Sequence, residues 1–382
     1  MAIVAAPTQQ TGRRAALARV GPFLSTYGVA IAFLLLVAFF AYMTQGTFTS
    51  RANLTNLSRQ ATMIGIIAVG MTVVMIGGGI DLSVGGIVGA VGVVTALLMV
   101  DRGWAMWPAI GAGLLLGAAL GLWNGVFVAR FDIAPFIVTL GMMSIARGVA
   151  LVLSAGASIV PSDPAFAALA AGAIPPGVSV GIILVGGALA AGMAVRRGRR
   201  ARANTGAAAM AIRVAVILLA AGAALYVFAP GGIPTPVAIW ATVAVAGVFL
   251  LNRTRFGRNV YAIGGNEEAA WLSAIDVNAV KLTIYTLSGL LAGLSAIILT
   301  SRQAAAVPQQ GTLYELDAIA AVVIGGTGLN GGYGTVVGSL LGVAIVASAN
   351  NGLSLMNIDP LWQYVVKGLI ITFAVLLDRR RR

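Results

Sequence analysis

The side chains able to carry ion or proton chemistry in the apolar part of this chain are four carboxylates, Asp81, Asp132, Glu315 and Asp317. A carboxylate in the middle of a membrane span would suit an ion-coupled carrier, because intramembrane charges usually mark an ion pathway. All four fall near the ends of apolar runs, which weakens that interpretation. Asp81 keeps it open, because it lies in the glycine-rich break GGGIDLSVGG between two apolar runs.

Several other kinds of chemistry have no residues to support them. The chain has no Cys and no His, which excludes a disulfide framework, thiol chemistry and imidazole ligands. No GxxxxGK[ST] motif occurs and the only lysines are Lys281 and Lys367, so ATP is not bound in the P-loop manner. HExxH is absent as well. We therefore expect no enzyme activity, metal or cofactor on this chain.

The stretch best suited to contact another protein is the polar island GRNVYAIGGNEEAAWLSAIDVNAVK at 257–281. Asn266 is placed to cap a short helix, and Glu267 and Glu268 follow in its first turn, where the helix dipole stabilises carboxylates. Ala269, Ala270 and Leu272 would form a small apolar side on that helix. A compact helix between two apolar spans suits docking into a groove of a partner. An ordinary solvated loop with a local helix is the alternative.

The composition requires a membrane to hold these elements. Hydrophobic residues make up 59% of the chain and charged residues 9%, with a mean hydropathy of +0.97. These values predict an all-α, polytopic membrane protein. The net charge of +13 comes from arginine clusters between apolar runs, so it reports membrane topology and not a nucleic-acid partner. The clusters lie at 13–14, 196–202, 253–258 and 379–382.

The apolar runs predict about 12 crossings, with both ends of the chain in the cytoplasm. They lie at 23–43, 61–79, 83–100, 105–128, 134–153, 177–194, 210–228, 236–251, 282–301, 316–326, 334–349 and 362–377. The run 316–326 is too short to cross alone, which indicates a broken helix. Segments 47–60 and 154–176 are expected outside, the latter with room for a short surface helix. Arg147 would either snorkel from its span to the interface or line a pathway.

Two glycine-rich breaks resemble each other, VVMIGGGIDLSVGG at 73–86 and VVIGGTGLNGGYG at 322–334. They suggest a parallel repeat of two halves, although glycine-rich turns can also resemble one another by chance. In a true repeat the breaks would face each other near a pathway, because broken backbone in a membrane is tolerated where it lines a cavity or is covered by protein. The residues expected to line or gate such a pathway are Gly79, Asp81, Ser83, Gly325, Gly326 and Asn330.

Five motifs in order, GGGIDLSVGG, GIPTP, RFGRNVYAIGGNEEAAWLSAIDV, YELDAIAAVVIGGTGLNGGYGT and WQYVVKG, carry a resemblance over nearly the whole chain. They resemble the permease subunit of sugar importers of the ATP-binding-cassette type, in the ribose, xylose and arabinose branch. The resemblance implies a homodimeric permease in the bacterial inner membrane. It also implies a cytoplasmic ATPase that holds ATP and Mg²⁺, and a periplasmic sugar-binding protein. It places the ATPase contact on Gly264, Gly265, Asn266, Glu267, Glu268, Ala269, Ala270, Leu272 and Ser273.

The resemblance also divides the chain. It implies one transmembrane permease domain over 1–382, with a cytoplasmic basic tail at 1–20 and a cytoplasmic coupling loop at 252–281. A hairpin at 177–228, with an arginine-rich cytoplasmic turn, is added relative to the ribose type and is similar to that of xylose permeases. The expected function is import of a monosaccharide, a pentose such as xylose, driven by ATP on a partner. The competing hypotheses are an ion-coupled secondary carrier of a small solute and a membrane-embedded enzyme.

Overall fold

The computed structural model describes residues 28–200, 207–359, 361–362, 365–369 and 372. The predicted basic tail at 1–20 and the arginine cluster at 379–382 lie outside the described residues, as does part of the arginine-rich turn. Within the described ranges the chain forms helices and no strand, apart from two isolated bridges, Ile159 with Ala306 and Ala173 with Pro234. The predicted all-α fold is confirmed.

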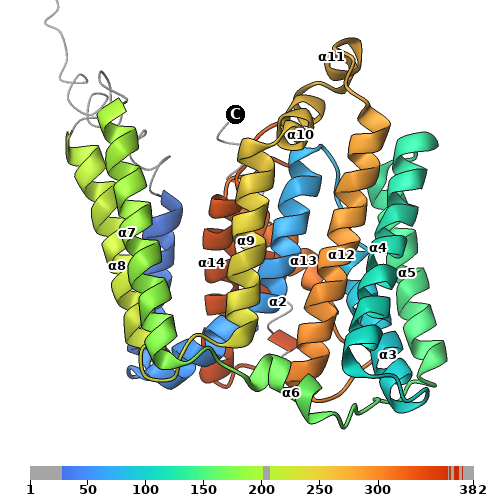
Figure 1. Cartoon of the computed structure of the whole chain (residues 1–382), viewed down its shortest axis with the longest axis horizontal. Helices are drawn as coiled ribbons and strands as arrows, with labels where there is room; N and C mark the ends of the chain where they lie inside the picture. Colours follow the sequence, from blue (N-terminus) through green and yellow to red (C-terminus); the bar gives the residue numbers. More distant parts are fainter. Residues whose placement is uncertain (1–27, 201–206, 360, 363–364, 370–371, 373–382) are drawn as a thin grey trace, which may run out of the picture.

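Long helices run side by side through the molecule, with α6 at one end and α10 and α11 at the other (Figure 1). Eight described helices are long and apolar enough to cross a membrane: α2 (Arg51–Ile76), α4 (Met106–Arg130), α5 (Pro135–Leu153), α7 (Pro176–Arg200), α8 (Ala207–Phe228), α9 (Thr235–Arg253), α12 (Val277–Gln303) and α14 (Val336–Leu355). Two apolar helices are shorter, Gly28–Met43 and α3 (Val84–Val100). The short elements are η1 (Thr47–Thr49), α6 (Pro164–Ala171), α10 (Arg255–Gly265), α11 (Glu267–Leu272) and α13 (Tyr314–Ile324). The membrane character is confirmed, whereas the count of 12 crossings is not.

Helix α2 begins ten residues before the apolar run predicted at 61–79, so most of the segment 47–60, which was expected outside the membrane, is helical. Ser50 has extended backbone geometry and its side chain accepts a hydrogen bond from Asn53 N at 3.3 Å, which caps the helix there. The polar residues that follow include neither Gly nor Pro, so nothing stops the helix from extending beyond its apolar part. The predicted short helix within 154–176 is present as α6.

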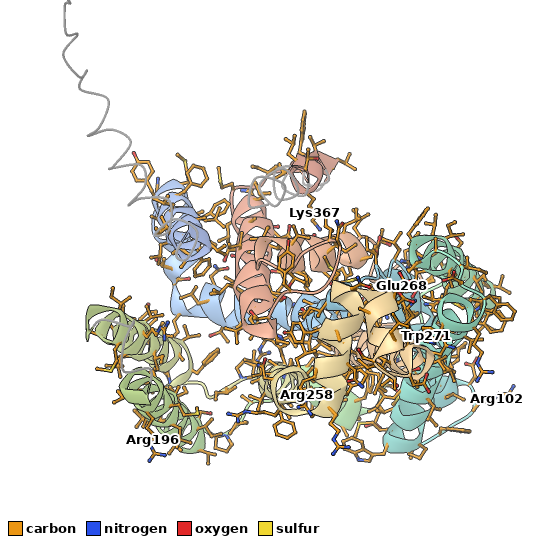
Figure 2. All side chains as sticks on the ribbon, turned by 90° about the horizontal axis from the view of Figure 1, so that it is seen from above. Arg102, Arg196, Arg258, Glu268, Trp271 and Lys367 are labelled. Carbon is orange, nitrogen blue, oxygen red and sulfur yellow. The ribbon has the colours of Figure 1, made fainter. Side chains whose placement is uncertain are left out.

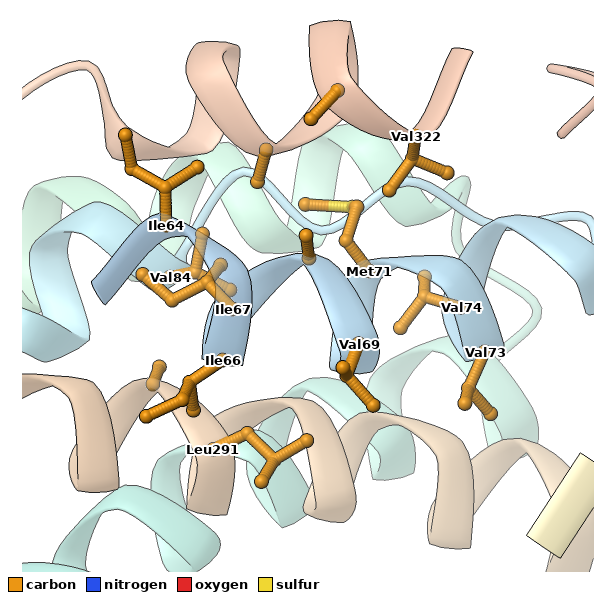
Figure 3. Packing of buried hydrophobic residues seen from close by; sticks show 14 of the residues in the cluster. Ile64, Ile66, Ile67, Val69, Met71, Val73, Val74, Val84, Leu291 and Val322 are labelled. Atoms are coloured by element: carbon orange, nitrogen blue, oxygen red, sulfur yellow. The ribbon is translucent and has the colours of Figure 1, made fainter. Parts of the chain in front are cut away.

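The centre of the bundle is α2. Of its most apolar 18 residues, 89% are buried. Figure 3 shows its side chains packed between Leu291 of α12 and Val322 of α13. Beside it, α4 and α12 approach at backbone distance, because Gly117 and Gly121 of α4 face Gly289 of α12, and a Cβ on Gly117 would lie 2.6 Å from the oxygen of Gly289. Small residues at such contacts let membrane helices pack closely.

The hairpin of α7 and α8 stands apart from this bundle (Figure 1). Its most apolar segments are 6% and 0% buried. The described contacts that join it to the bundle gather at the α6 end. There the Arg51 guanidinium donates to the backbone oxygen of Tyr226 at 2.8 Å, and the Ser179 hydroxyl accepts from Ile233 N at 2.9 Å. The hairpin is therefore attached mainly at one end.

The predicted broken helix is confirmed. Helix α13 has 11 residues, which at 1.5 Å per residue is about 17 Å and far short of a bilayer core of about 30 Å. The loop before it packs inside the bundle and is fastened by Arg147, which donates to the oxygens of Pro308, Gln310 and Gly85 at 2.9–3.2 Å. These contacts satisfy irregular backbone inside the protein, and both interpretations of Arg147 from the sequence stay predictions.

The arrangement predicts which positions share a side of the membrane. Because the chain has no native Cys, single cysteines at exposed positions can be labelled without background. We expect Arg196→Cys and Glu268→Cys to react with an impermeant thiol reagent from one side, and Arg102→Cys and Ala157→Cys from the other. Labelling of Arg196→Cys and Ala157→Cys from the same side would contradict this arrangement.

Candidate functional site

Three glycine-rich segments meet at the end of the bundle that carries α10 and α11. Gly332 N donates to the oxygen of Ile76, the last residue of α2, at 2.9 Å. Gly264, near the end of α10, lies against both groups, so that a Cβ there would overlap them. Gly331, at φ +84°, packs on Gly78. The two breaks that resemble each other in sequence are therefore in contact, with α10 packed on both.

The predicted pathway residues divide into three groups. Gly79 and Asn330 line a cavity of about 310 Å³ beside α10 and the start of α12, together with Asp132, Lys281 and Tyr285. Asp81 and Ser83 are fully buried beneath it. Gly325 and Gly326 lie away from this cavity: Gly325 faces Gly338 of α14 at backbone distance, and Gly326 turns the chain at φ +89°. Gly79 and Asn330 are thus the two of the six that reach the cavity, and a pathway function stays a prediction for all of them.

Asp81 is the centre of a buried polar cluster at the start of α3. Its Oδ1 accepts from Ser83 N at 2.9 Å and from Ser83 Oγ at 2.5 Å, and its Oδ2 accepts from Ser288 Oγ at 2.7 Å. Asn124 of α4 donates to Ser83 Oγ at 2.8 Å. The carboxylate also lies at the N-terminus of α3, where the helix dipole favours negative charge. The cluster joins α3, α4 and α12, which gives Asp81 a structural purpose without an ion.

Glu315 and Asp317 lie deeper than the sequence predicts. They were expected near the end of a span, but they occupy the first turn of α13, which begins inside the bundle, and both are buried. Asp317 forms an ion pair with Lys367 at 2.8 Å and accepts from Asn350 at 3.4 Å. Pairing with a cation offsets the cost of burying the carboxylate.

The predicted docking helix is present as α11. Asn266 caps it by accepting from Ala269 N at 2.9 Å, and Ser273 Oγ donates to the Ala269 oxygen at 2.8 Å. Glu267 pairs with Lys281 of α12 at 2.6 Å, while Glu268 is exposed. The helix is therefore fixed to the bundle through its first turn.

The apolar contact side predicted for α11 needs correction. Ala270 is only 4% exposed and is packed within the chain, whereas Trp271 is 67% and Leu272 72% exposed. Ala270 points toward the bundle, so the side chains of Trp271 and Leu272, which follow it around the helix, point outward. Figure 2 shows Trp271 and Glu268 on the outer face. The sequence analysis overlooked Trp271, although an exposed Trp is a common interface anchor.

An open groove of about 790 Å³ lies against α11. Its polar and aromatic lining includes Glu267, Glu268, Trp271, Asp276 and Asn278. It presents three carboxylates around one aromatic ring. Such a surface suits a partner with basic and apolar side chains.

Helix α10, which the sequence analysis left within the island, connects this surface to the glycine contacts. Thr254 caps it by accepting from Gly257 N at 3.1 Å, a Thr-to-Gly spacing that could have revealed its start. The Tyr261 hydroxyl donates to the Gly334 oxygen at 2.8 Å. Burial raises the pKa of Tyr261, so the hydroxyl stays neutral and keeps donating at physiological pH. A shift of α10 would therefore move the 325–335 loop with it.

Known proteins with similar sequences were found over almost the whole chain. Residues 53–375 match the family described as the permease component of the branched-chain amino acid transport system. The xylose transport system permease protein XylH of Escherichia coli K12 is 40% identical over 364 residues, covering 93% of this chain and 92% of that protein. The ribose import permease protein RbsC of Bacillus subtilis is 38% identical over 363 residues, covering 95% and 93%. No solved structure matches the chain.

The glycine contacts make a prediction that two adjacent residues can test. Gly264→Val places side-chain atoms on the Ile76 oxygen and on Gly332 N, whereas nothing lies within 4 Å of a Cβ on Gly265. We expect Gly264→Val to destabilise the protein by about 1–3 kcal/mol, the usual cost of overpacking, and Gly265→Val to cost much less. Thermal unfolding of the purified variants measures both. Equal melting temperatures would contradict the contact of α10 with the two breaks.

Proposed function

The chain belongs to this permease family and is an ABC-type sugar permease of the xylose and ribose branch, and on that premise we propose that it imports a pentose, xylose in particular. Its relatives with 37–40% identity are described as xylose and ribose permeases. Helices α7 and α8 over 177–228 are in keeping with the hairpin that suggested the xylose type. The homologues are transport permeases, which are not enzymes themselves.

The observation that carries the proposed mechanism is the contact of α10 with both glycine-rich breaks. Family membership implies a partner ATPase and a periplasmic binding protein. In our proposal ATP and Mg²⁺ bind the ATPase, which docks on α11 through the groove at Glu268 and Trp271. Force applied to α11 passes through α10 to Gly332 and Gly78, where backbone touches backbone and no flexible side chain can absorb the movement. A neutral sugar then needs no charged midplane site.

The orientation follows from charge. The α10–α11 end carries Arg253, Arg255 and Arg258, and the end of α7, with Arg196, belongs to the same end (Figure 1). The positive-inside rule favours the cytoplasm for this end, and we propose the same side for both termini. The α6 end would then face the periplasm and the binding protein. The ion-coupled carrier receives no support from the relatives, and Asp81 is already satisfied by protein donors.

Helix α5 offers a surface for the expected second copy. Gly141, Ser144 and Gly148 follow one another at spacings of three and four residues, which places them on one face. A Cβ on Gly141 or Gly148 would have no neighbour within 4 Å, and Ser144 is exposed. Small residues on an open membrane face are the usual contact between transmembrane helices. We therefore propose that α5 pairs with α5 of a second copy.

The proposed transport activity can be measured in proteoliposomes that contain the chain, its ATPase and the sugar-binding protein. We expect ATP-dependent uptake of xylose that continues when an ionophore collapses ion gradients. Trp271→Ala should lower uptake at least tenfold and lose the ATPase during purification, because an interface anchor is worth about 2 kcal/mol. Its amount in the membrane should be normal, since Trp271 is exposed.

The control is Trp104→Ala, another exposed Trp, in the turn between α3 and α4. It should retain the ATPase. If Trp271→Ala keeps both its partner and normal uptake, the docking proposal is wrong. Uptake that stops with the ionophore while ATP is held constant would instead favour the ion-coupled carrier.

Cysteine crosslinking tests the pairing of two copies. Gly148→Cys on α5 should form an intermolecular disulfide on mild oxidation, because the small face would bring the two cysteines together. Gly222→Cys on α8 is the matched control, since a Cβ there also has no neighbour within 4 Å. Equal crosslinking at both positions, or none at Gly148→Cys, would argue against pairing through α5.

A further inference from the structure

The cavity of about 310 Å³ beside α10 and the start of α12 has a buried floor and an exposed rim. The floor consists of side chains that are at most 3% exposed, namely Val74, Val128, Ile263, Ile284 and Tyr285. The rim contains Gly78, Asp132, Glu267 and Asn330, which are all exposed. Asp81 is fully buried beneath the floor. The cavity is therefore a pocket that opens at the α10–α11 end and is closed toward the middle of the bundle.

One buried polar atom at the floor of this pocket has nothing to bond to. The Tyr285 hydroxyl has no hydrogen-bond partner among the described residues, although the side chain is only 2% exposed. Gly79 lies directly against that hydroxyl, so that a Cβ at position 79 would overlap it. Because Gly79 also lines the pocket, the missing side chain leaves the hydroxyl open to a molecule inside. A buried hydroxyl without a partner costs free energy, and a ligand that bonds to it removes that cost.

The rim adds groups that accept and donate hydrogen bonds but favour no strong charge. Lys281 Nζ pairs with Glu267 at 2.6 Å and, as an ammonium with three donors, keeps others for a ligand. Asp132 adds a second carboxylate, which forms no ion pair among the described residues, and Asn330 adds an amide. Two carboxylates and one ammonium leave a net charge of −1, which disfavours phosphate compounds and other anions. These groups fit a neutral molecule with several hydroxyls.

The volume of the pocket narrows the choice of ligand. Ligand pockets usually measure about 300–1,000 Å³, so 310 Å³ lies at the lower end and suits a molecule of monosaccharide size. Under the proposed function and orientation, on which this inference rests, import delivers such a molecule to this side of the membrane.

We propose that the pocket binds a monosaccharide from the cytoplasm and that the bound sugar slows transport. Its hydroxyls bond to the Tyr285 hydroxyl at the floor and to Asp132, Lys281 and Asn330 nearer the rim. The site is separate from the transport pathway, because the pocket is closed toward the middle of the bundle.

The inhibition follows from which parts of the chain form the pocket. Gly264 of α10 and Glu267 of α11 line it together with Gly78 and Asn330, one from each glycine-rich break. A bound sugar therefore connects the helix pair α10 and α11 to both breaks. A ligand stabilises the arrangement that it binds, so a movement of α10 relative to the breaks must first release the sugar. A high concentration of sugar inside the cell then opposes further import.

The direct test is thermal unfolding of the purified chain with increasing xylose. We expect xylose to raise the melting temperature, and Tyr285→Phe to weaken xylose binding about fivefold, the usual contribution of one neutral hydrogen bond. Without xylose, Tyr285→Phe should melt no lower than the unchanged chain, because the hydroxyl has no described partner. The matched control is Tyr42→Phe, which removes an exposed hydroxyl outside the pocket and should bind xylose normally. A lower melting temperature of Tyr285→Phe without xylose would assign the hydroxyl to the fold and overturn the proposal.

A second variant narrows the pocket without removing a polar group. Ile133 lines the rim and is exposed, so Ile133→Trp should leave the protein folded and reduce xylose binding. Unchanged xylose binding in either Tyr285→Phe or Ile133→Trp would overturn the proposal. So would a larger stabilisation by inorganic phosphate or by the diamine putrescine that Ile133→Trp abolishes, because the pocket would then bind a charged ligand.

Proteoliposomes with the ATPase and ATP inside and the sugar-binding protein outside measure the inhibition. Initial uptake of labelled xylose should fall to about half when unlabelled xylose inside half-saturates the pocket. Tyr285→Phe should import normally into sugar-free vesicles and need about five times more internal xylose for the same inhibition. Normal uptake that ignores internal xylose would overturn this inference and leave the proposed function standing. No uptake into sugar-free vesicles would instead contradict the proposed function and overturn both.

Discussion

Every irregular backbone segment inside this bundle must find hydrogen-bond partners in the protein, because the hydrocarbon offers none. The loop before α13 finds them in Arg147, and in Gln310, whose side-chain oxygen accepts from Val307 N at 3.4 Å. The break before α3 finds one in Asp81, whose carboxylate accepts from Ser83 N and is itself held by the Ser288 hydroxyl. The half-length helices can exist only because these side chains are placed there, and the polar residues of the core are explained by that requirement before any transport function is considered.

The same broken backbone makes coupling possible. A continuous helix resists bending, whereas a glycine-rich break lets the segments on either side move relative to each other. Here two such breaks lie against one helix pair, α10 and α11, through Gly264, Gly331 and Gly332. A movement of α11 would therefore be transmitted to α2, α3 and α13 together. This geometry suits a permease whose energy source lies on another subunit.

The sequence predicted the fold class, the broken helix α13 and the cap at Asn266, because composition, run length and local capping chemistry are one-dimensional signals. It did not predict which way side chains point or how deep residues lie within the bundle. Hydropathy shows that a run is apolar but not where its helix begins inside the bundle, so Glu315 and Asp317 were placed too near the surface. Residue type could not show that Ala270 turns inward while Trp271 turns outward. The partners of Arg147 are about 160 positions away in sequence for two of its three bonds, and no local pattern indicates them.

The hairpin of α7 and α8 and the bundle around α2 are held in place by different sets of contacts. Helix α2 is buried on nearly all sides, so a change in it is felt by α9, α12, α13 and α14 together. The hairpin touches the bundle mainly near Tyr226 and Ser179, and its apolar segments are almost unburied. A part held at one end can change its angle to the bundle without breaking the contacts at Gly264. We therefore expect the hairpin to change its angle without affecting the contacts from α11 to the glycine-rich breaks, on which the proposed ATPase would act.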